Sequence, residues 1–155
     1  MVTIKTTHIA KENISKYGSV VLSPRNSPTA QAREFKFWSD LACYTVHGET
    51  EIGICTVYRQ PAMEVNAVER HSLTPEILIP IDGSFILPLL KEGVTDDQME
   101  AFRVDVGEAV VINPGVWHGA CLPAKGKQAS YFVVFRRRTP QEDVVKKRIQ
   151  AISIR

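Results

Sequence analysis

Residues 68–85, VERHSLTPEILIPIDGSF, place ionisable side chains beside a run that is typical of a buried strand. On a strand Glu69 and His71 point to one face while Arg70 points to the other, and Glu76 opens the next apolar run. Two carboxylates about 4 Å apart repel by roughly 4 kcal/mol at an effective dielectric constant of 20. Burial costs several kcal/mol more for each unpaired ion. These groups therefore indicate a bound cation or a shared proton.

The chain around this stretch contains many short predicted strands separated by turns. This pattern predicts an all-β sandwich or barrel. Asp82-Gly83 lies between EILIPI and SFILPLL and predicts a hairpin. Pro88 in the second arm predicts an edge position or a bulge. An apolar edge is expected to be covered, for which a second subunit is one candidate. The predicted strands are 51–59, 66–71, 76–81, 84–90, 99–105, 108–112 and 130–136.

Two helices are expected outside the strands. Residues 9–17 predict a short helix that ends at Gly18, followed by a turn-rich loop at 23–30. Near the other end, Thr139-Pro140-Gln141-Glu142 predicts a helix start with a capping box. Val145, Ile149 and Ile152 follow at helical spacing, so a C-terminal helix is expected at about 140–152.

Chain length, net charge and cysteine content limit the classes of protein to which this sequence can belong. The 155 residues suit one domain, with a core expected at about 14–137, and the net charge of +2 argues against nucleic acid as the main partner. Three cysteines without close spacing fit a reducing compartment better than a disulfide framework. We find no signal-peptide pattern and no apolar run of membrane-spanning length, so a cytoplasmic protein is expected.

Spacing ties the ionisable groups together. Glu69-x-His71, then Glu76 and Gly83, and later Gly107 and Asn113-x-Gly115-x-x-His118 resemble the two-part signature of the cupin superfamily. That resemblance implies a jelly-roll barrel, a double-stranded β-helix, with the signature side chains pointing inward. Glu69 takes the place of the first histidine of the signature, and His71, Glu76 and His118 match it. Two histidines with carboxylates suit a first-row divalent metal such as nickel, manganese or zinc.

A purely structural role for these residues also remains open. Glu69 and Glu76 could pair with arginines at the barrel mouth, and His71 could simply bond to backbone. Four groups at this spacing favour a site over that alternative.

Longer pieces of sequence resemble one family within this superfamily. ISKYGSVV, RQPAMEVNAVERHSLTPEILIPIDGSFILPLL, AFRVDVGEAVVI and GVWHG are similar to the ureidoglycolate lyase family, from Ile14 to about Arg136. Some positions depart from the family pattern, and they are expected in or near the pocket: Glu76, Glu100, Ile112 and Gly119.

The resemblance implies a lyase that cleaves ureidoglycolate to glyoxylate and urea in allantoin degradation. It implies a metal held by His71, His118 and one or both of Glu69 and Glu76, with the other carboxylate acting as base and then as acid. Arg59 and Arg103 are candidates for the substrate carboxylate, and Trp117 for a substrate contact or a core position. Family members tend to pair, so a homodimer is expected.

Two other functions remain open. One is a different metal-dependent cupin enzyme, an isomerase, dioxygenase or decarboxylase acting on a small acid. The other is a non-catalytic cupin that only binds a small acid. A bound transition metal that is lost when His71 is replaced would favour an enzyme.

Overall fold

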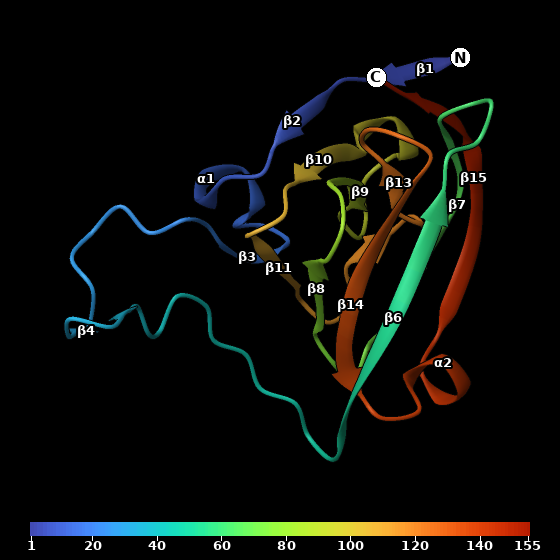
Figure 1. Cartoon of the computed structure of the whole chain (residues 1–155). Helices are drawn as coiled ribbons and strands as arrows, with labels where there is room; N and C mark the ends of the chain where they lie inside the picture. The colour runs from blue at the N-terminus through green and yellow to red at the C-terminus, as the bar shows by residue number, and fades with distance from the viewer.

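The computed structural model describes residues 1–155, and its regular structure consists mainly of short strands (Figure 1). Its elements are β1 (Val2–Ile4), β2 (Thr6–His8), α1 (Lys11–Ile14), β3 (Gly18–Val21), β4 (Ala30–Gln31), β5 (Lys36–Phe37), β6 (Thr50–Tyr58), β7 (Glu64–Arg70), β8 (Glu76–Pro80), β9 (Phe85–Leu90), the 3-10 helix η1 (Asp96–Gln98), β10 (Glu100–Val104), β11 (Ala109–Ile112), β12 (Trp117–His118), β13 (Leu122–Pro123), β14 (Gln128–Arg136), α2 (Thr139–Glu142) and β15 (Val145–Ile154). All seven predicted strands are confirmed, with ends that differ by two residues at most.

Two sheets face each other and enclose the core. The first, sheet A, has the order β1-β15-β7-β12-β9-β10-β2, with β13 also on β9. The second, sheet B, has the order β3-β11-β8-β14-β6. From β6 to β14 successive strands alternate between the sheets, apart from the connection between β9 and β10 and that between β12 and β13. This is the double Greek-key arrangement of a jelly roll, so the predicted cupin-type barrel is confirmed.

The hairpin predicted at Asp82-Gly83 is wrong. β8 pairs with β11 and β14 in sheet B, whereas β9 pairs with β10, β12 and β13 in sheet A. The two residues therefore turn the chain from one sheet to the other. The Asp82 side chain accepts a hydrogen bond from the Ser130 backbone N–H at 2.7 Å, which anchors this corner to β14.

The edge position predicted for β9 is also wrong. Phe85, Leu87 and Leu89 belong to the core between the sheets, while Ile86 and Leu90 belong to a second apolar cluster. Alternate side chains of a strand point to opposite faces, so β9 is buried on both. Pro88 is tolerated inside the sheet because the neighbouring strand is interrupted there, between β12 and β13. The run FILPLL thus gives no reason to expect a second subunit.

The predicted C-terminal helix at 140–152 is a single helical turn, α2, followed by the long strand β15. The expected capping box does not form either, because the Glu142 carboxylate accepts from the Arg138 side chain instead. β15 pairs with β7 and with β1, and its register with β7 shifts between Arg148 and Ile152. Because of this irregularity, Ile149 and Ile152 contact the same apolar cluster although they are three residues apart. The spacing of apolar residues on this bulged strand is therefore the same as on one face of a helix.

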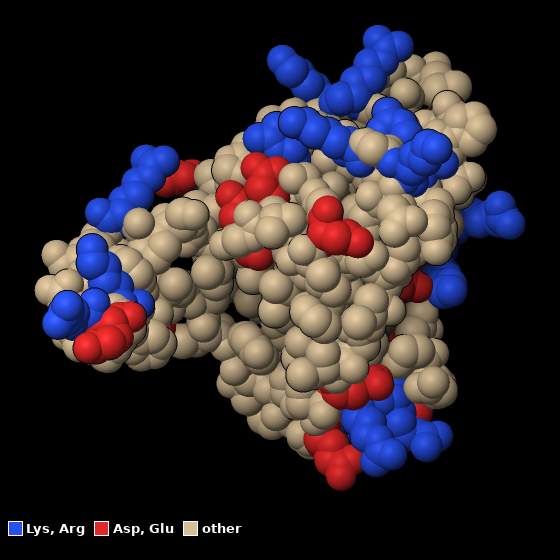
Figure 2. All heavy atoms as spheres, viewed as in Figure 1, with Lys and Arg blue, Asp and Glu red and all other residues tan.

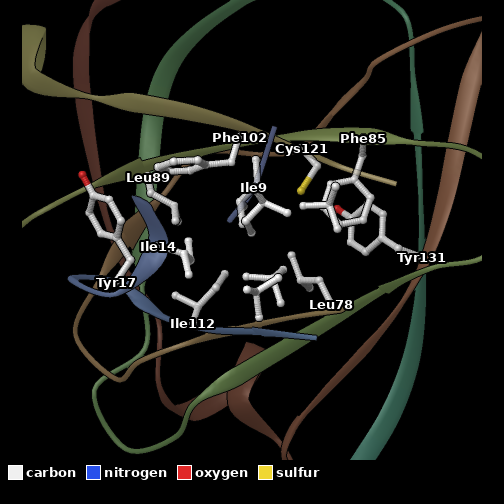
Figure 3. Close-up of a cluster of buried hydrophobic side chains, with 14 of the residues drawn as sticks. Ile9, Ile14, Tyr17, Leu78, Phe85, Leu89, Phe102, Ile112, Cys121 and Tyr131 are labelled. Atoms are coloured by element: carbon white, nitrogen blue, oxygen red, sulfur yellow. The ribbon is translucent and has the colours of Figure 1, made fainter. Parts of the chain in front are cut away.

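The main core fills the space between the sheets, and its side chains converge from both (Figure 3). The predicted N-terminal helix is confirmed as the shorter α1, which buries Ile14 in this core. Tyr17 follows it and packs edge-on against Phe102, with ring centroids 5.9 Å apart. No helix of the structure is long and apolar enough to cross a membrane.

Gly18 is fixed by a close approach of two strands. A Cβ atom at this position would lie 1.8 Å from the Val111 carbonyl oxygen on β11. Only glycine lets β3 come this near, so the Tyr17-Gly18 pair sets how the N-terminal segment joins sheet B.

Candidate metal centre

Three ionisable side chains meet at one end of the barrel. His71 follows the end of β7, Glu76 begins β8, and His118 ends the short strand β12. Their exposed fractions are only 5%, 8% and 7%. The fold thus joins both sheets at this cluster, and Glu69, the fourth residue expected at the metal site, lies beside it.

The cluster converges on one carboxylate oxygen. Oε2 of Glu76 lies 3.0 Å from Nε2 of His118 and 3.4 Å from Nε2 of His71. The two imidazole rings are tilted against each other with centroids 5.1 Å apart. Neither Oε2 of Glu76 nor Nε2 of His118 has a hydrogen-bond partner, although both atoms are fully buried.

The hydrogen bond of Nδ1 of His71 determines which ring nitrogen carries the hydrogen. Nδ1 lies 2.7 Å from the backbone carbonyl oxygen of Asp143, which can only accept, so Nδ1 carries the hydrogen. In a neutral imidazole Nε2 then presents a lone pair toward the lone pairs of the Glu76 carboxylate. Such an arrangement is stable only if a proton or a cation lies between them.

The donor atoms fit a divalent metal. Two ligand atoms that each lie about 2.1 Å from one ion are about 3.0 Å apart at a right angle and about 3.4 Å apart at the tetrahedral angle. The spacings of Glu76 from His118 and His71 fall in this range, and Glu69, His71 and His118 also form a group with ligand spacing. Two imidazoles and a carboxylate are also a donor set that first-row divalent metals accept.

In the metal-free protein, protons on the neighbouring histidines balance the negative charge of the Glu76 carboxylate. Burial acts to raise the pKa of Glu76, but the imidazoles of His118 and His71 outweigh it and lower this pKa to about 2. Burial acts to lower the pKa of His71, but Glu76, with help from the Asp143 carbonyl, raises it overall. The carboxylate is therefore ionised across the physiological range and attracts positive charge.

Glu69 stands beside the cluster in a more open position. Its ligand oxygen lies within 4.8 Å of ligand nitrogens of His71 and His118. β7 and β12 pair so that Glu69 is opposite His118. The carboxylate is about one third exposed and lies 3.7 Å from the Lys146 ammonium group on β15. Of the two carboxylates, Glu76 is the buried one and Glu69 is the accessible one.

The pocket at this cluster is narrow, and in this structure it is too small to hold a water molecule. Side chains that sequence reasoning did not assign complete it: Thr74, Val116 and Asn113. Asn113 occupies the place where the cupin signature usually has proline, and that departure was the only signal that could have found it. The turn Pro114-Gly115 closes this side, where Gly115 donates its N–H to the His71 carbonyl at 2.6 Å.

Asp143 supports the cluster from behind. Besides the bond of its carbonyl to His71, its carboxylate accepts from the backbone N–H groups of Ser72 at 3.0 Å and Leu73 at 2.9 Å. It holds both the imidazole and the segment that follows it. Nothing local in the sequence indicates this role, because Asp143 lies 72 residues from His71.

The predicted substrate contacts do not line the pocket. Arg103 forms an ion pair with Asp105 at 3.1 Å, and Arg59 is an exposed residue just beyond β6. Trp117 points to the second apolar cluster, where its ring stacks with Arg70 and its N–H donates to Glu92.

Two of the four departures from the family pattern also lie elsewhere. Glu100 accepts a hydrogen bond from the Tyr17 hydroxyl at 2.5 Å, and a side chain at Gly119 would press on Val65 and Pro88. Only Glu76 and Ile112 line the pocket. Glu100 and Gly119 therefore do not line the pocket, although Gly119 directly follows His118 in the chain.

Two other places hold grouped polar residues. A larger hollow of about 540 Å³ lies between β1, β15 and η1, but it contains neither histidine nor cysteine. His8, Asp105 and Glu108 form a second group with ligand spacing. Its members are more exposed and bonded to one another, with His8 2.8 Å from Glu108. Only the cluster at Glu76 combines burial with unpartnered donor atoms.

Comparison with known proteins gives a family. A model of the ureidoglycolate lyase family matches residues 1–154. No curated protein matches the chain.

Among solved structures, the formate complex of Lactobacillus farciminis oxalate decarboxylase has a TM-score of 0.48 at 12% identity, covering 63% of this chain and 26% of that chain. Bacillus subtilis oxalate decarboxylase has a TM-score of 0.45 at 13% identity, covering 57% and 22%. Peruvianin-I, a cysteine peptidase from Thevetia peruviana latex, has a TM-score of 0.47 at 13% identity, covering 63% and 54%. The match spans less than two thirds of each of these chains, and likeness at this level does not bear on function.

Proposed function

The chain belongs to the ureidoglycolate lyase family, and from this premise we propose that it cleaves ureidoglycolate to glyoxylate and urea, a step of allantoin degradation. The observation that carries the proposal is the buried cluster of His71, Glu76 and His118, in which Oε2 of Glu76 and Nε2 of His118 lack hydrogen-bond partners. A buried carboxylate between two imidazoles is expensive to fold, which supports a functional role.

His71, Glu76 and His118 would hold a divalent metal, with nickel, manganese and zinc as candidates. When bound, the ion supplies positive charge that binds an α-hydroxy acid and lowers the pKa of its hydroxyl group. The protein supplies orientation. The Asp143 carbonyl fixes the His71 ring, and the strand pairing of β7 with β12 fixes His118 beside Glu69.

Glu69 is the residue that we assign to proton transfer, because its carboxylate is accessible and lies beside the buried cluster. It takes the proton of the substrate hydroxyl, and the O–H electron pair becomes the second bond of the glyoxylate carbonyl as the C–N bond breaks. The leaving urea nitrogen receives the proton from Glu69. No water is consumed, and Glu69 returns to its ionised state.

The substrate carboxylate needs a cationic partner near the cluster. Lys146, which lies beside Glu69, is the cation that we assign to the substrate carboxylate in place of Arg59 and Arg103.

Release of glyoxylate and urea from racemic ureidoglycolate tests the proposal, with purified protein loaded with nickel, manganese or zinc. We expect equal amounts of the two products. His118→Ala is expected to lose both bound metal and turnover, while Glu69→Gln keeps the metal and loses turnover by at least 100-fold. His47→Ala is the matched control, because His47 is an exposed histidine outside the cluster.

Metal-loaded, folded protein that releases neither product would overturn the proposed reaction. Turnover unchanged in His118→Ala would overturn the assignment of the site. If the metal binds at the cluster but ureidoglycolate is not cleaved, the chain is a cupin with another small-acid chemistry.

A further inference from the structure

The two histidines of the metal centre each follow a residue whose side chain points away from it. Arg70 precedes His71 at the end of β7, and Trp117 precedes His118 on β12. Successive side chains of a strand point to opposite faces, so an inward histidine leaves its neighbour on the outside of sheet A. Trp117 accordingly belongs to the second apolar cluster. The two outward residues therefore share the backbone that carries the two histidines.

On the outside of sheet A these two residues contact each other. The guanidinium carbon of Arg70 lies 4.5 Å from the centre of the Trp117 ring. One oxygen of Glu92, Oε2, accepts a hydrogen bond from Nη1 of Arg70 at 2.6 Å and another from the ring N–H of Trp117. Glu92 lies just beyond the end of β9. Arg70, Glu92 and Trp117, which we call the clamp, thus join the neighbouring strands β7, β12 and β9.

The arginine of the clamp is largely withdrawn from solvent. On the face of the molecule shown in Figure 2, many Lys and Arg side chains extend outward from the surface. The Arg70 side chain is only 28% exposed, and its Nε is fully buried without a hydrogen-bond partner. A buried N–H that lacks a partner costs free energy, which other contacts must offset. The stack on Trp117 and the charge-assisted bond to Glu92 are such contacts, and they hold the guanidinium group in one place.

Strand pairing provides few contacts between the segments that carry the two histidines. β12 has only two residues, Trp117 and His118, and its register with β7 consists of one pair, His118 opposite Glu69. His71 lies one residue beyond the end of β7. A metal centre requires its ligands to be held within about 0.5 Å of the binding geometry. Side-chain contacts between β7 and β12 supply this precision where the strand ladder is short.

We propose that the clamp is a positioning device, which holds β7 and β12 at the separation where His71 and His118 bind one divalent metal. The inference rests on the proposed function, because it takes the buried cluster as the metal site. No residue of the clamp lines the pocket of that site. The clamp therefore acts through the backbone, and Trp117 has a positioning role in place of the substrate contact predicted from the sequence.

Titration of the metal-free protein with Co²⁺ tests the clamp, because the visible absorption of bound Co²⁺ reports the geometry of its ligands as well as the affinity. We expect Arg70→Ala and Trp117→Leu to lower the affinity by about 10-fold to 100-fold and to change the absorption spectrum. Trp117→Phe keeps a ring for the stack and Glu92→Gln keeps an acceptor oxygen, so smaller losses of about 3-fold to 10-fold are expected. Arg137→Ala is the matched control and should change neither quantity, because Arg137 pairs with Glu49 at 2.8 Å and both side chains are exposed.

Urea unfolding of each metal-free variant separates positioning from stability. Affinity is compared only under conditions where the variant is folded, and Glu92→Gln provides a mild substitution, because the Glu92 side chain is 63% exposed. A role in stability alone would lower the free energy of unfolding and leave the Co²⁺ affinity and spectrum of the folded variants at their native values. That result would overturn the proposal.

Failure of the proposed function gives a different pattern. His118→Ala is expected to abolish Co²⁺ binding at the cluster. If the native protein binds no Co²⁺ at His71 and His118, the metal site is overturned and the clamp with it. If the native protein binds Co²⁺ there and the clamp variants bind it equally well, only the clamp is overturned. Weaker binding with a changed spectrum in the clamp variants supports the clamp, even if the protein does not cleave ureidoglycolate.

Discussion

Glu76 is the residue on which the chemistry of the cluster depends, because its buried carboxylate lies within 3.4 Å of Nε2 of both histidines. In the metal-free protein its pKa is lowered, so its contribution to stability is present above the unfolded value of about 4.3 and is lost as the pH falls toward 2. The pKa of His71 is raised, so its contribution is complete below about 6.5 and is lost as the pH rises through the raised pKa.

Glu76→Gln tests this balance in chelator-treated protein. We expect the free energy of unfolding to fall by about 3 kcal/mol at pH 5.5, where both contributions are present, and by less at pH 8. Urea denaturation at the two pH values measures the difference, and Glu12→Gln on the exposed side of α1 is the control. Equal stability of Glu76→Gln and the native protein at pH 5.5 would show that the carboxylate is not held as an ion between the histidines.

At the scale of single elements, the connection between α2 and β15 positions the cluster through Asp143. Asp143→Ala removes the acceptor for the Ser72 and Leu73 N–H groups and leaves the segment after His71 less constrained. We expect metal affinity to fall between 10-fold and 100-fold, with Asp143→Asn in between because it keeps one acceptor oxygen. Isothermal titration with the metal measures this. Glu142→Ala, whose side chain bonds to Arg138, should leave the affinity unchanged.

The pairing of β3 with β11 makes a separate prediction about stability. Gly18→Ala forces a Cβ atom against the Val111 carbonyl oxygen, so the strands must separate, and we expect a loss of about 2 kcal/mol or more. Gly53→Ala on β6 is the control, because the nearest atom to its Cβ would be the Val133 carbonyl oxygen at 4.0 Å. Thermal unfolding that is equal in the two variants would contradict this account of β3.

Elements differ in how well local sequence predicted them. The strands from β6 to β11 follow from short apolar runs between turn residues. The grouping of His71, Glu76 and His118 was implied by the resemblance of their spacing to the cupin signature. β15 was missed because its bulge depends on pairing with β7, and Asp82-Gly83 was misread because the choice between hairpin and sheet crossing depends on distant strands. Asp143 was missed for the same reason.

At the scale of the whole molecule, the jelly roll explains why the site lies where it does. The strands that carry the cluster belong to different sheets, β7 and β12 to sheet A and β8 to sheet B. The barrel therefore closes around the three side chains, and their burial is a consequence of the fold.

The most direct test of the central claim is a crystal structure of the metal-loaded protein with anomalous scattering recorded at the absorption edge of the metal. The account predicts one strong peak at bonding distance, about 2.0–2.3 Å, from Nε2 of His71, Nε2 of His118 and Oε2 of Glu76. A peak at His8, Asp105 and Glu108 with none at this cluster would contradict it, because the buried donors would then serve some purpose other than holding the metal.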